Sequence, residues 1–160
     1  ENVFATAAAR AVIAPETVAR QGMTLQELAG LLRSHGVTVE AIHGDRLDLA
    51  RFRTLLRRSL ADPGDRLLVN YHRAAVGQQG GGHISPLAAY HAPSDRALIL
   101  DVARYRYPAV WVELPQLWQA IRGLDSTSGR SRGVVVVSRG AAPVAAPPGA
   151  PPPACSRSGG

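Results

Sequence analysis

The sequence contains one cysteine, Cys155, and no lysine in its 160 residues. A single cysteine excludes an internal disulfide framework and a zinc site built from cysteines. No apolar run approaches the roughly 20 residues of a membrane-spanning helix, so we expect no membrane partner. No signal peptide is recognisable. The compartment, cytoplasmic or periplasmic, stays open because we expect the natural start of the protein to lie upstream of Glu1.

Positive charge comes from arginine alone. Its 18 basic residues and 12 acidic residues give the chain a formal net charge of +6. The arginines are spread from Arg10 to Arg157, and their densest group, four between residues 51 and 58, has no interleaved aromatic platform. Surfaces that bind nucleic acids combine a concentrated basic patch with stacking aromatics. We therefore expect no nucleic-acid partner.

The apolar spacing predicts an α+β fold in which N-terminal helices precede a mostly antiparallel sheet. Thr24 and Glu27 form a capping box, and apolar residues repeat behind them at helical spacing until a stop at Gly36. Val134 to Val137 is a continuous apolar run, typical of a central strand. The other predicted elements are helices at about 15–21, 48–60 and 114–122, and strands at about 37–42, 66–71, 84–90 and 97–100.

The composition changes at Gly140. Of the last 21 residues, 16 are alanine, proline or glycine, and no periodicity survives. Such a segment cannot bury enough apolar surface to fold. We therefore expect one domain over residues 1–139 and a disordered Pro/Ala/Gly-rich tail over 140–160, in which Cys155 is an exposed and inert thiol.

A glycine-rich run, residues 77–82, leads into a predicted β-hairpin with two chemically active side chains. His83 begins the first strand, Asp101 ends the second, and four breakers at 92–95 form the loop. If Ser85 pairs with Asp101, His83 and Asp101 are diagonal neighbours on one face, whereas a shift of one residue puts them on opposite faces. The loop length suits both registers. Two interpretations of the glycines stay open. They allow a backbone with positive φ that leaves room for a ligand, or they form a flexible loop before an ordinary strand and histidine.

A metal site is the rival interpretation of these side chains, because His72, His83, His91 and Asp101 are all potential ligands. Their spacings of eleven, eight and ten residues match no compact metal pattern. His83 and His91 also fall at opposite ends of one predicted strand. The sequence therefore predicts no metal site in the chain.

Several ungapped blocks resemble phytochelatin synthase. They are AVIAPETVARQGMTLQELAGLL, NYHRAAVGQQGGGHISPLAAYH, RALILDVARYRYPAVWVEL, LWQAI and STSGRSRGVVVVSR, in this order over roughly Asn2 to Arg139. The likeness is strongest to the short bacterial form, which is similar in turn to papain-like cysteine peptidases. The resemblance implies a papain-like fold, present here as a partial domain.

In that family a Cys–His–Asp triad takes the γ-glutamylcysteinyl group from glutathione and passes it to a second glutathione or to water. By this resemblance His83 and Asp101 are the catalytic histidine and aspartate. Arg104, Asp125 and Arg132 fall on substrate-binding positions, and Gly82, beside His83, joins the predicted substrate-binding set. A guanidinium can hold the α-carboxylate of the γ-glutamyl group, while a carboxylate takes its amino group.

The family's nucleophilic cysteine, and a glutamine of its oxyanion hole, lie in a segment that we expect upstream of Glu1. The chain alone is therefore predicted to be inactive and to expose apolar side chains opposite His83. The resemblance implies no resident cofactor; cadmium or zinc enters as a thiolate complex with glutathione, which links the family to heavy-metal detoxification. Two alternatives stay open: an inactive binder of γ-glutamyl peptides, and a papain-like peptidase acting on other peptides. A homodimer is also left open.

Overall fold

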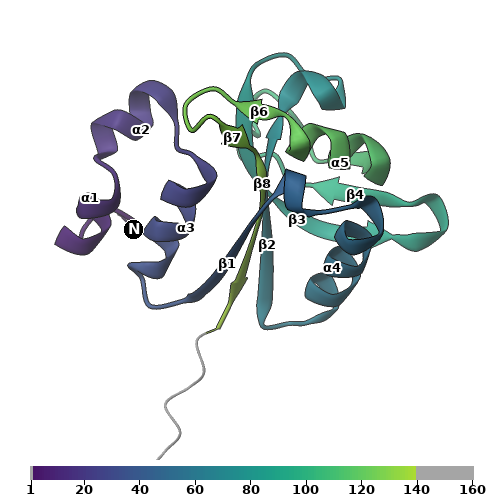
Figure 1. The fold of residues 1–160 in the computed structure, drawn as a ribbon, viewed down its shortest axis with the longest axis horizontal. Helices are drawn as coiled ribbons and strands as arrows, with labels where there is room; N and C mark the ends of the chain where they lie inside the picture. The colour runs from purple at the N-terminus through teal and green to yellow at the C-terminus, as the bar shows by residue number, and fades with distance from the viewer. Residues whose placement is uncertain (1, 140–160) are drawn as a thin grey trace, which may run out of the picture.

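The computed structural model describes residues 2–139, and the predicted tail with Cys155 lies outside them. Within this range an α+β fold is present, with three helices before an antiparallel sheet (Figure 1). The helices are α1 (Ala7–Val12), α2 (Pro15–Gln21), α3 (Leu25–Arg33), α4 (Leu49–Ala61) and α5 (Leu114–Arg122). The strands are β1 (Thr38–His43), β2 (Asp65–His72), β3 (Gly82–His91), β4 (Arg96–Ile99), β5 (Val110–Glu113), β6 (Leu124–Asp125), β7 (Arg130–Ser131) and β8 (Gly133–Ser138).

Local capping explains why the N-terminal helices begin and end where they do. The predicted capping box is confirmed: the Thr24 side chain accepts a hydrogen bond from the Glu27 amide, and the Glu27 carboxylate accepts one from the Thr24 amide. Gly22 ends α2 with a φ of 74°, a conformation in which glycine carries no Cβ penalty. The segment between α2 and α3 is therefore a fixed turn, and it borders the site described below.

The sheet has six strands in the order β1-β8-β2-β3-β4-β5, and all neighbours are antiparallel. The last strand within residues 2–139, β8, thus lies between β1 and β2. Val134 and Val136 face one layer of helices, while Val135 faces the other. Burial on both faces explains the unbroken apolar run and confirms its prediction as a central strand.

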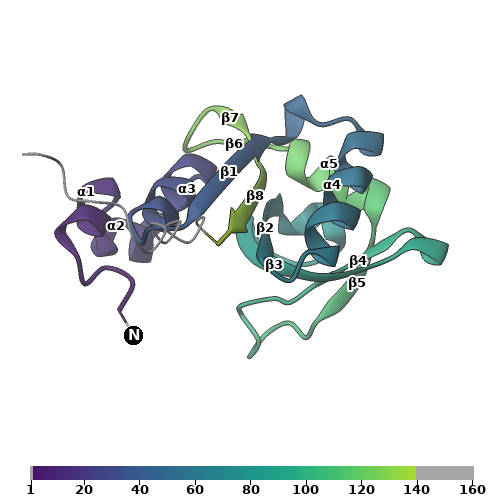
Figure 2. The same cartoon turned by 90° about the horizontal axis from the view of Figure 1, so that it is seen from below.

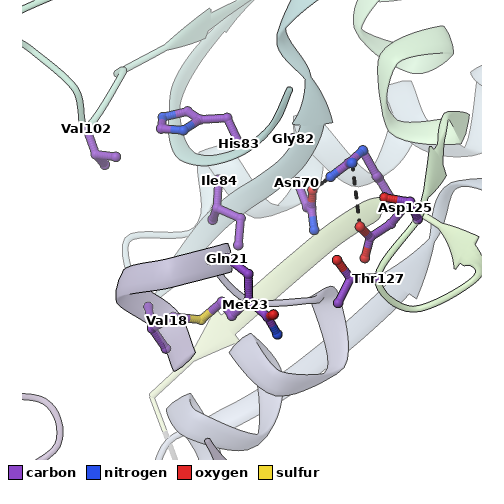
Figure 3. Close-up of a pocket in the computed structure, with 13 residues that line it drawn as sticks. Val18, Gln21, Met23, Asn70, Gly82, His83, Ile84, Val102, Asp125 and Thr127 are labelled. Atoms are coloured by element: carbon purple, nitrogen blue, oxygen red, sulfur yellow. Dashed lines mark hydrogen bonds and ion pairs between the residues drawn. The ribbon is translucent and has the colours of Figure 1, made fainter. Parts of the chain in front are cut away.

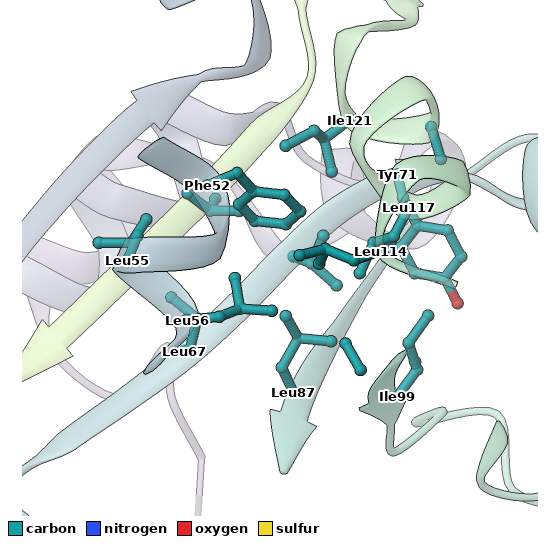
Figure 4. Close-up of a cluster of buried hydrophobic side chains, with 14 of the residues drawn as sticks. Phe52, Leu55, Leu56, Leu67, Tyr71, Leu87, Ile99, Leu114, Leu117 and Ile121 are labelled. Atoms are coloured by element: carbon teal, nitrogen blue, oxygen red, sulfur yellow. The ribbon is translucent and has the colours of Figure 1, made fainter. Parts of the chain in front are cut away.

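Two hydrophobic cores lie on opposite faces of the sheet. The larger packs α4 and α5 against β2 to β5, with Phe52, Leu56, Leu117 and Ile121 fully buried (Figure 4). The smaller packs α3 against β1 and β8. Figure 2 shows α4 and α5 within the curve of the sheet and α1 to α3 on the other side of β1.

Large apolar side chains are exposed in and around the β3–β4 hairpin. Leu100 is 42 % exposed, Val102 61 % and Trp111 45 %. Of these three residues only Val102 lines the same cleft as His83, so the apolar surface predicted opposite His83 stays a prediction. Among residues 2–139, no helix is long and apolar enough to cross a membrane.

Several elements were not predicted. Helix α1 lies in an alanine-rich segment without an apolar period, and it begins because the Thr6 hydroxyl accepts a hydrogen bond from the Ala9 amide. Strand β5 has four residues, and the two residues each of β6 and β7 form a separate small hairpin. Such short strands show too few alternations to be recognised.

Candidate functional site

The β3–β4 hairpin brings His83 and Asp101 to one face by means of a β-bulge. Next to the loop its register would place the two side chains on opposite faces, and the bulge between Leu87 and Ala89 shifts the pairing by one residue. Leu87 pairs with Ile99, and the Leu100 amide then donates to the Pro86 carbonyl, so the pairing continues toward Asp101 just past the end of β4. His83 Nε2 lies 3.1 Å from Asp101 Oδ1. This hydrogen bond confirms the predicted geometry, while the catalytic roles of the two residues stay predictions.

The imidazole of His83 is held on two sides. Nε2 contacts Asp101, and the Tyr71 ring lies edge-on at 5.9 Å between centroids. No protein group within residues 2–139 forms a hydrogen bond with Nδ1. A neutral imidazole that donates through Nε2 carries its lone pair on Nδ1. The ring is therefore arranged to take a proton through that atom.

Asp101 is only 2 % exposed, yet it remains charged because its environment supplies donors. The Arg73 guanidinium donates from Nη1 to Oδ2 at 2.6 Å and from Nη2 to Oδ1 at 2.9 Å. The Ala103 amide donates to Oδ1 at 2.8 Å. Burial alone raises the pKa of this carboxyl, but the Arg73 and Ala103 donors and the nearby positive charge lower it to about 2.

Burial lowers the pKa of His83 below its ordinary value, and the positive charge of Arg73 lowers it further. These two effects outweigh Asp101, which favours the imidazolium. At neutral pH the imidazole is consequently uncharged. A neutral histidine with a fixed ring and a free lone pair can act as a general base.

The second part of the site lies around Arg132, which is 8 % exposed. Its Nη1 donates to Asn70 Oδ1 at 2.9 Å, and its Nη2 lies 3.6 Å from Asp125 Oδ1. The Nε of Arg132 is buried and has no protein partner among the described residues. Ser128 donates to the other oxygen of Asp125 at 2.9 Å, which steadies the carboxylate. A fixed cation and a fixed anion thus lie side by side.

His83 and the Arg132–Asp125 pair line one cleft of about 480 Å³. Its walls come from β2, β3, the segment after β4, the β6–β7 hairpin, and the end of α2 with the turn that follows it (Figure 3). The lining residues are Val18, Gln21, Gly22, Met23, Asn70, Gly82, His83, Ile84, Val102, Asp125, Ser126, Thr127 and Arg132. A base and a pair of opposite charges therefore face the same space.

The glycines before His83 make room for two arginine side chains. A Cβ on Gly82 would lie 2.1 Å from Arg132 Nη1, and one on Gly80 would lie 3.1 Å from Arg73 Cδ. Gly80 also has a φ of 120°, which few other residues adopt. The sequence suggested that these glycines leave room for a ligand. At Gly80 and Gly82 the space is instead occupied by the side chains of two arginines of the protein itself.

Four of the six predicted substrate-binding and catalytic residues line the cleft, whereas Asp101, behind His83, and Arg104 do not. Arg104 is exposed and lines another cavity of about 630 Å³, together with Leu100, Tyr107 and Pro108. Only Val102 borders both cavities. The predicted role of Arg104 in substrate binding stays a prediction.

Sequence reasoning missed Arg73, Asn70 and Tyr71, the residues that support the site from behind. No sequence pattern identifies them, because the residues that they contact, Asp101 and Arg132, are far away in the sequence. Among the residues that the structure describes, no three His, Cys, Asp or Glu side chains are grouped as a metal site would require.

An α+β domain in which a histidine, oriented by an aspartate behind it, faces a charged cleft is consistent with acyl-transfer chemistry. Comparison with known proteins supplies the family. The model of the phytochelatin synthase family matches residues 2–134. The chain belongs to this family.

Among curated relatives, glutathione gamma-glutamylcysteinyltransferase 3 of Lotus japonicus is 39 % identical over 124 residues, which are 78 % of this chain and 26 % of that protein. Glutathione gamma-glutamylcysteinyltransferase 2 of Arabidopsis thaliana is 37 % identical over 78 % of the chain and 27 % of its own length. The Schizosaccharomyces pombe enzyme is 28 % identical over 75 % of the chain and 29 % of its own length. The chain thus spans about a quarter of these relatives.

The depressed pKa of Asp101 predicts acid sensitivity. Its carboxylate is stabilised by folding, so this stability is fully present above the unfolded pKa of about 4 and is lost as the pH falls toward about 2. We expect Asp101 to contribute about 2 to 3 kcal/mol to the free energy of unfolding at neutral pH relative to pH 2. Denaturation in urea at several pH values measures this term.

The Asp101→Asn variant is the control, because it cannot titrate. The difference in unfolding free energy between the parent and this variant should be largest above about pH 5 and should narrow toward pH 2. Two parallel curves over this range would show that Asp101 has an ordinary pKa.

Proposed function

We propose that this chain supplies the acid–base pair and the γ-glutamyl site of a glutathione γ-glutamylcysteinyltransferase. The observation that carries the proposal is the opening of His83 and of the Asp125–Arg132 pair onto one cleft. Family membership supports the choice of glutathione as substrate. His83 serves as base and acid, and Asp101 orients its ring.

The reaction begins when His83 takes the proton of a cysteine thiol. This cysteine is proposed to come from residues outside the 160-residue sequence, because the sequence has only Cys155, beyond the described residues. The thiolate attacks the carbonyl carbon of the Cys–Gly peptide bond of glutathione. The imidazolium of His83 then donates its proton to the departing glycine nitrogen, which leaves a γ-glutamylcysteinyl thioester.

The second half of the reaction uses the same histidine. His83 takes a proton from the amino group of a second glutathione, or from water, as that group attacks the thioester carbonyl. The thiolate leaves and regains a proton. With glutathione as acceptor the product is a phytochelatin; with water it is γ-glutamylcysteine.

Recognition of the γ-glutamyl end is assigned to the charged pair of the cleft. Arg132 meets the α-carboxylate and Asp125 meets the α-ammonium group, so that each end of the zwitterion faces the opposite charge. The opening of both Asp125 and Arg132 onto the cleft supports this assignment. A peptidase for ordinary peptides would have no need of this pair.

Heavy metal enters the proposal as part of the substrate. Cadmium or zinc bound by the thiol of glutathione is carried into the cleft with the peptide. An inactive binder of γ-glutamyl peptides is the second candidate, because none of residues 2–139 is a cysteine. Release of glycine separates the two candidates.

The first test supplies the thiol. The chain fused behind the nucleophile segment of a full-length relative should release glycine from glutathione, whereas the 160-residue chain alone should release none. In the fusion, His83→Ala should abolish release, and Asp101→Ala should lower kcat by roughly 10³- to 10⁴-fold, because the ring loses its orienting partner. Glycine is measured by amino-acid analysis.

The Cys→Ser variant of the same fusion is the control. Equal rates from the cysteine and serine fusions would contradict the thiol mechanism. A fusion that binds glutathione and releases no glycine would favour the inactive binder.

A second test concerns the space that Gly82 provides. Gly82→Ala places a methyl group against the Arg132 guanidinium and should displace it from the cleft. We expect the affinity for glutathione, measured by calorimetry, to fall about tenfold or more, because the substrate loses at least one charge-assisted hydrogen bond.

Gly81→Ala is a matched control one residue away, because a Cβ there meets nothing within 4 Å. It should leave the affinity unchanged. Similar affinities for the parent and both variants would remove Arg132 from substrate binding.

A further inference from the structure

A buried arginine that takes no part in the proposed proton transfers lies behind the His83–Asp101 pair. Arg73 begins a short 3₁₀ turn directly after β2 and is only 6 % exposed. It does not line the cleft that contains His83 and Arg132. Burying a guanidinium is costly unless its charge and donors are matched, so this position requires an explanation.

The glycine-rich loop, residues 77–82, closes around the Arg73 side chain. Gln78 accepts a hydrogen bond from Arg73 Nη1 at 2.7 Å, and the Gly81 carbonyl accepts one from the Arg73 amide at 2.9 Å. Gly80 leaves the space that Arg73 Cδ occupies. The loop therefore holds the arginine along its length.

Tyr107 covers the guanidinium from the other side. Its ring lies 4.5 Å from Arg73 Cζ, within the range of a cation–π contact. Its hydroxyl donates to the Gln79 carbonyl at 2.9 Å and accepts from the Gln79 amide at 3.1 Å, which ties the tyrosine to the loop. Arg73 is thus held between the loop 77–82 and the ring of Tyr107.

The contacts of Arg73 with Asp101 are a two-point fork, at 2.6 and 2.9 Å. Two parallel bonds fix the plane of a carboxylate, whereas a single ammonium group fixes only a point. With its plane set, Asp101 Oδ1 faces His83 Nε2. The orientation of the imidazole therefore depends on the arginine, through the carboxylate.

We propose that Arg73 is a positioning residue whose fork sets the plane of Asp101 and thereby the orientation of His83, and that the loop 77–82 with Tyr107 exists to hold this arginine. The geometry is independent of the proposed function; only its consequence for catalysis rests on that function. A lysine at position 73 would keep the charge and lose the fork.

The experiment follows the Nε2 proton of His83 by NMR in the 160-residue chain. A hydrogen-bonded imidazole proton resonates far downfield and exchanges slowly with water. Arg73→Lys and Arg73→Gln are compared with the parent, and amide spectra show that each variant is folded. The His83 pKa is measured in the same samples.

The charged and titratable groups that bear on this pKa are Asp101 and Arg73, with Tyr71 at the ring edge and Asp125 and Arg132 lining the same cleft. Only position 73 changes among the variants. We expect the downfield proton of the parent to be lost in both, and the His83 pKa to rise in Arg73→Gln, where the repelling charge is removed.

Arg53→Gln is the matched control. Arg53 forms the same kind of fork with Asp95, at 2.9 and 2.7 Å, at the far end of the hairpin. It should leave the His83 signal unchanged. A downfield proton that persists in Arg73→Lys or Arg73→Gln overturns the proposal, as does its absence from the parent or its loss in the control.

If neither Arg73 variant folds, Tyr107→Leu decides in their place. This variant keeps Arg73 and removes its cover, so the His83 signal should weaken, and an unchanged signal overturns the proposal. Neither readout needs a thiol or glutathione. Failure of the fusion to release glycine would consequently reject the proposed function without touching this inference.

Discussion

The buried ion pair between Arg73 and Asp101 is the interaction on which the arrangement of the site depends. Both side chains are nearly inaccessible, and each would be strongly unfavourable in the interior without the other. A buried pair of this kind contributes little net stability when compared with apolar residues of the same size. Its role here is to orient the carboxylate of Asp101. The fork fixes the plane of this carboxylate, keeps it charged at neutral pH and holds it beside Nε2 of His83.

The cleft is made by segments far apart in the chain. His83 comes from β3 and Asn70 from β2. Asp125 lies in β6, and Arg132 lies between β7 and β8. The position of β8 between β1 and β2 brings these last residues to the centre of the sheet. Packing of α4 and α5 beneath β2 to β5 keeps the strands in register, and the cleft inherits its rigidity from this core.

Much of the fold could be predicted from local patterns. The Thr24–Glu27 capping box and the Val134–Val137 run each have one physical interpretation, and both are confirmed. Helix α1 and strand β5 could not be predicted, because an alanine-rich turn and a four-residue strand carry almost no periodicity. The register of the β3–β4 hairpin could not be predicted, because no sequence pattern marks the β-bulge between Leu87 and Ala89 that shifts its pairing by one residue.

The candidate site was predictable only in part. His83 and Asp101 were recognisable from a hairpin and a family resemblance, whereas Arg73 was not, because a buried arginine in a turn looks like any surface arginine in sequence. The glycine-rich run was recognisable in the sequence, but its neighbours in space were not. Only the structure shows that Gly80 and Gly82 border the side chains of Arg73 and Arg132.

The central claim is that the cleft between His83 and the Asp125–Arg132 pair binds a γ-glutamyl group. The most direct measurement is an NMR titration of the isotopically labelled 160-residue chain with glutathione, and with its isomer in which glutamate is joined through the α-carboxyl. We predict that glutathione shifts the signals of Gly82, His83 and Arg132 and that the isomer does so far more weakly. Equal shifts by both peptides, or shifts confined to residues outside the cleft, would contradict the account.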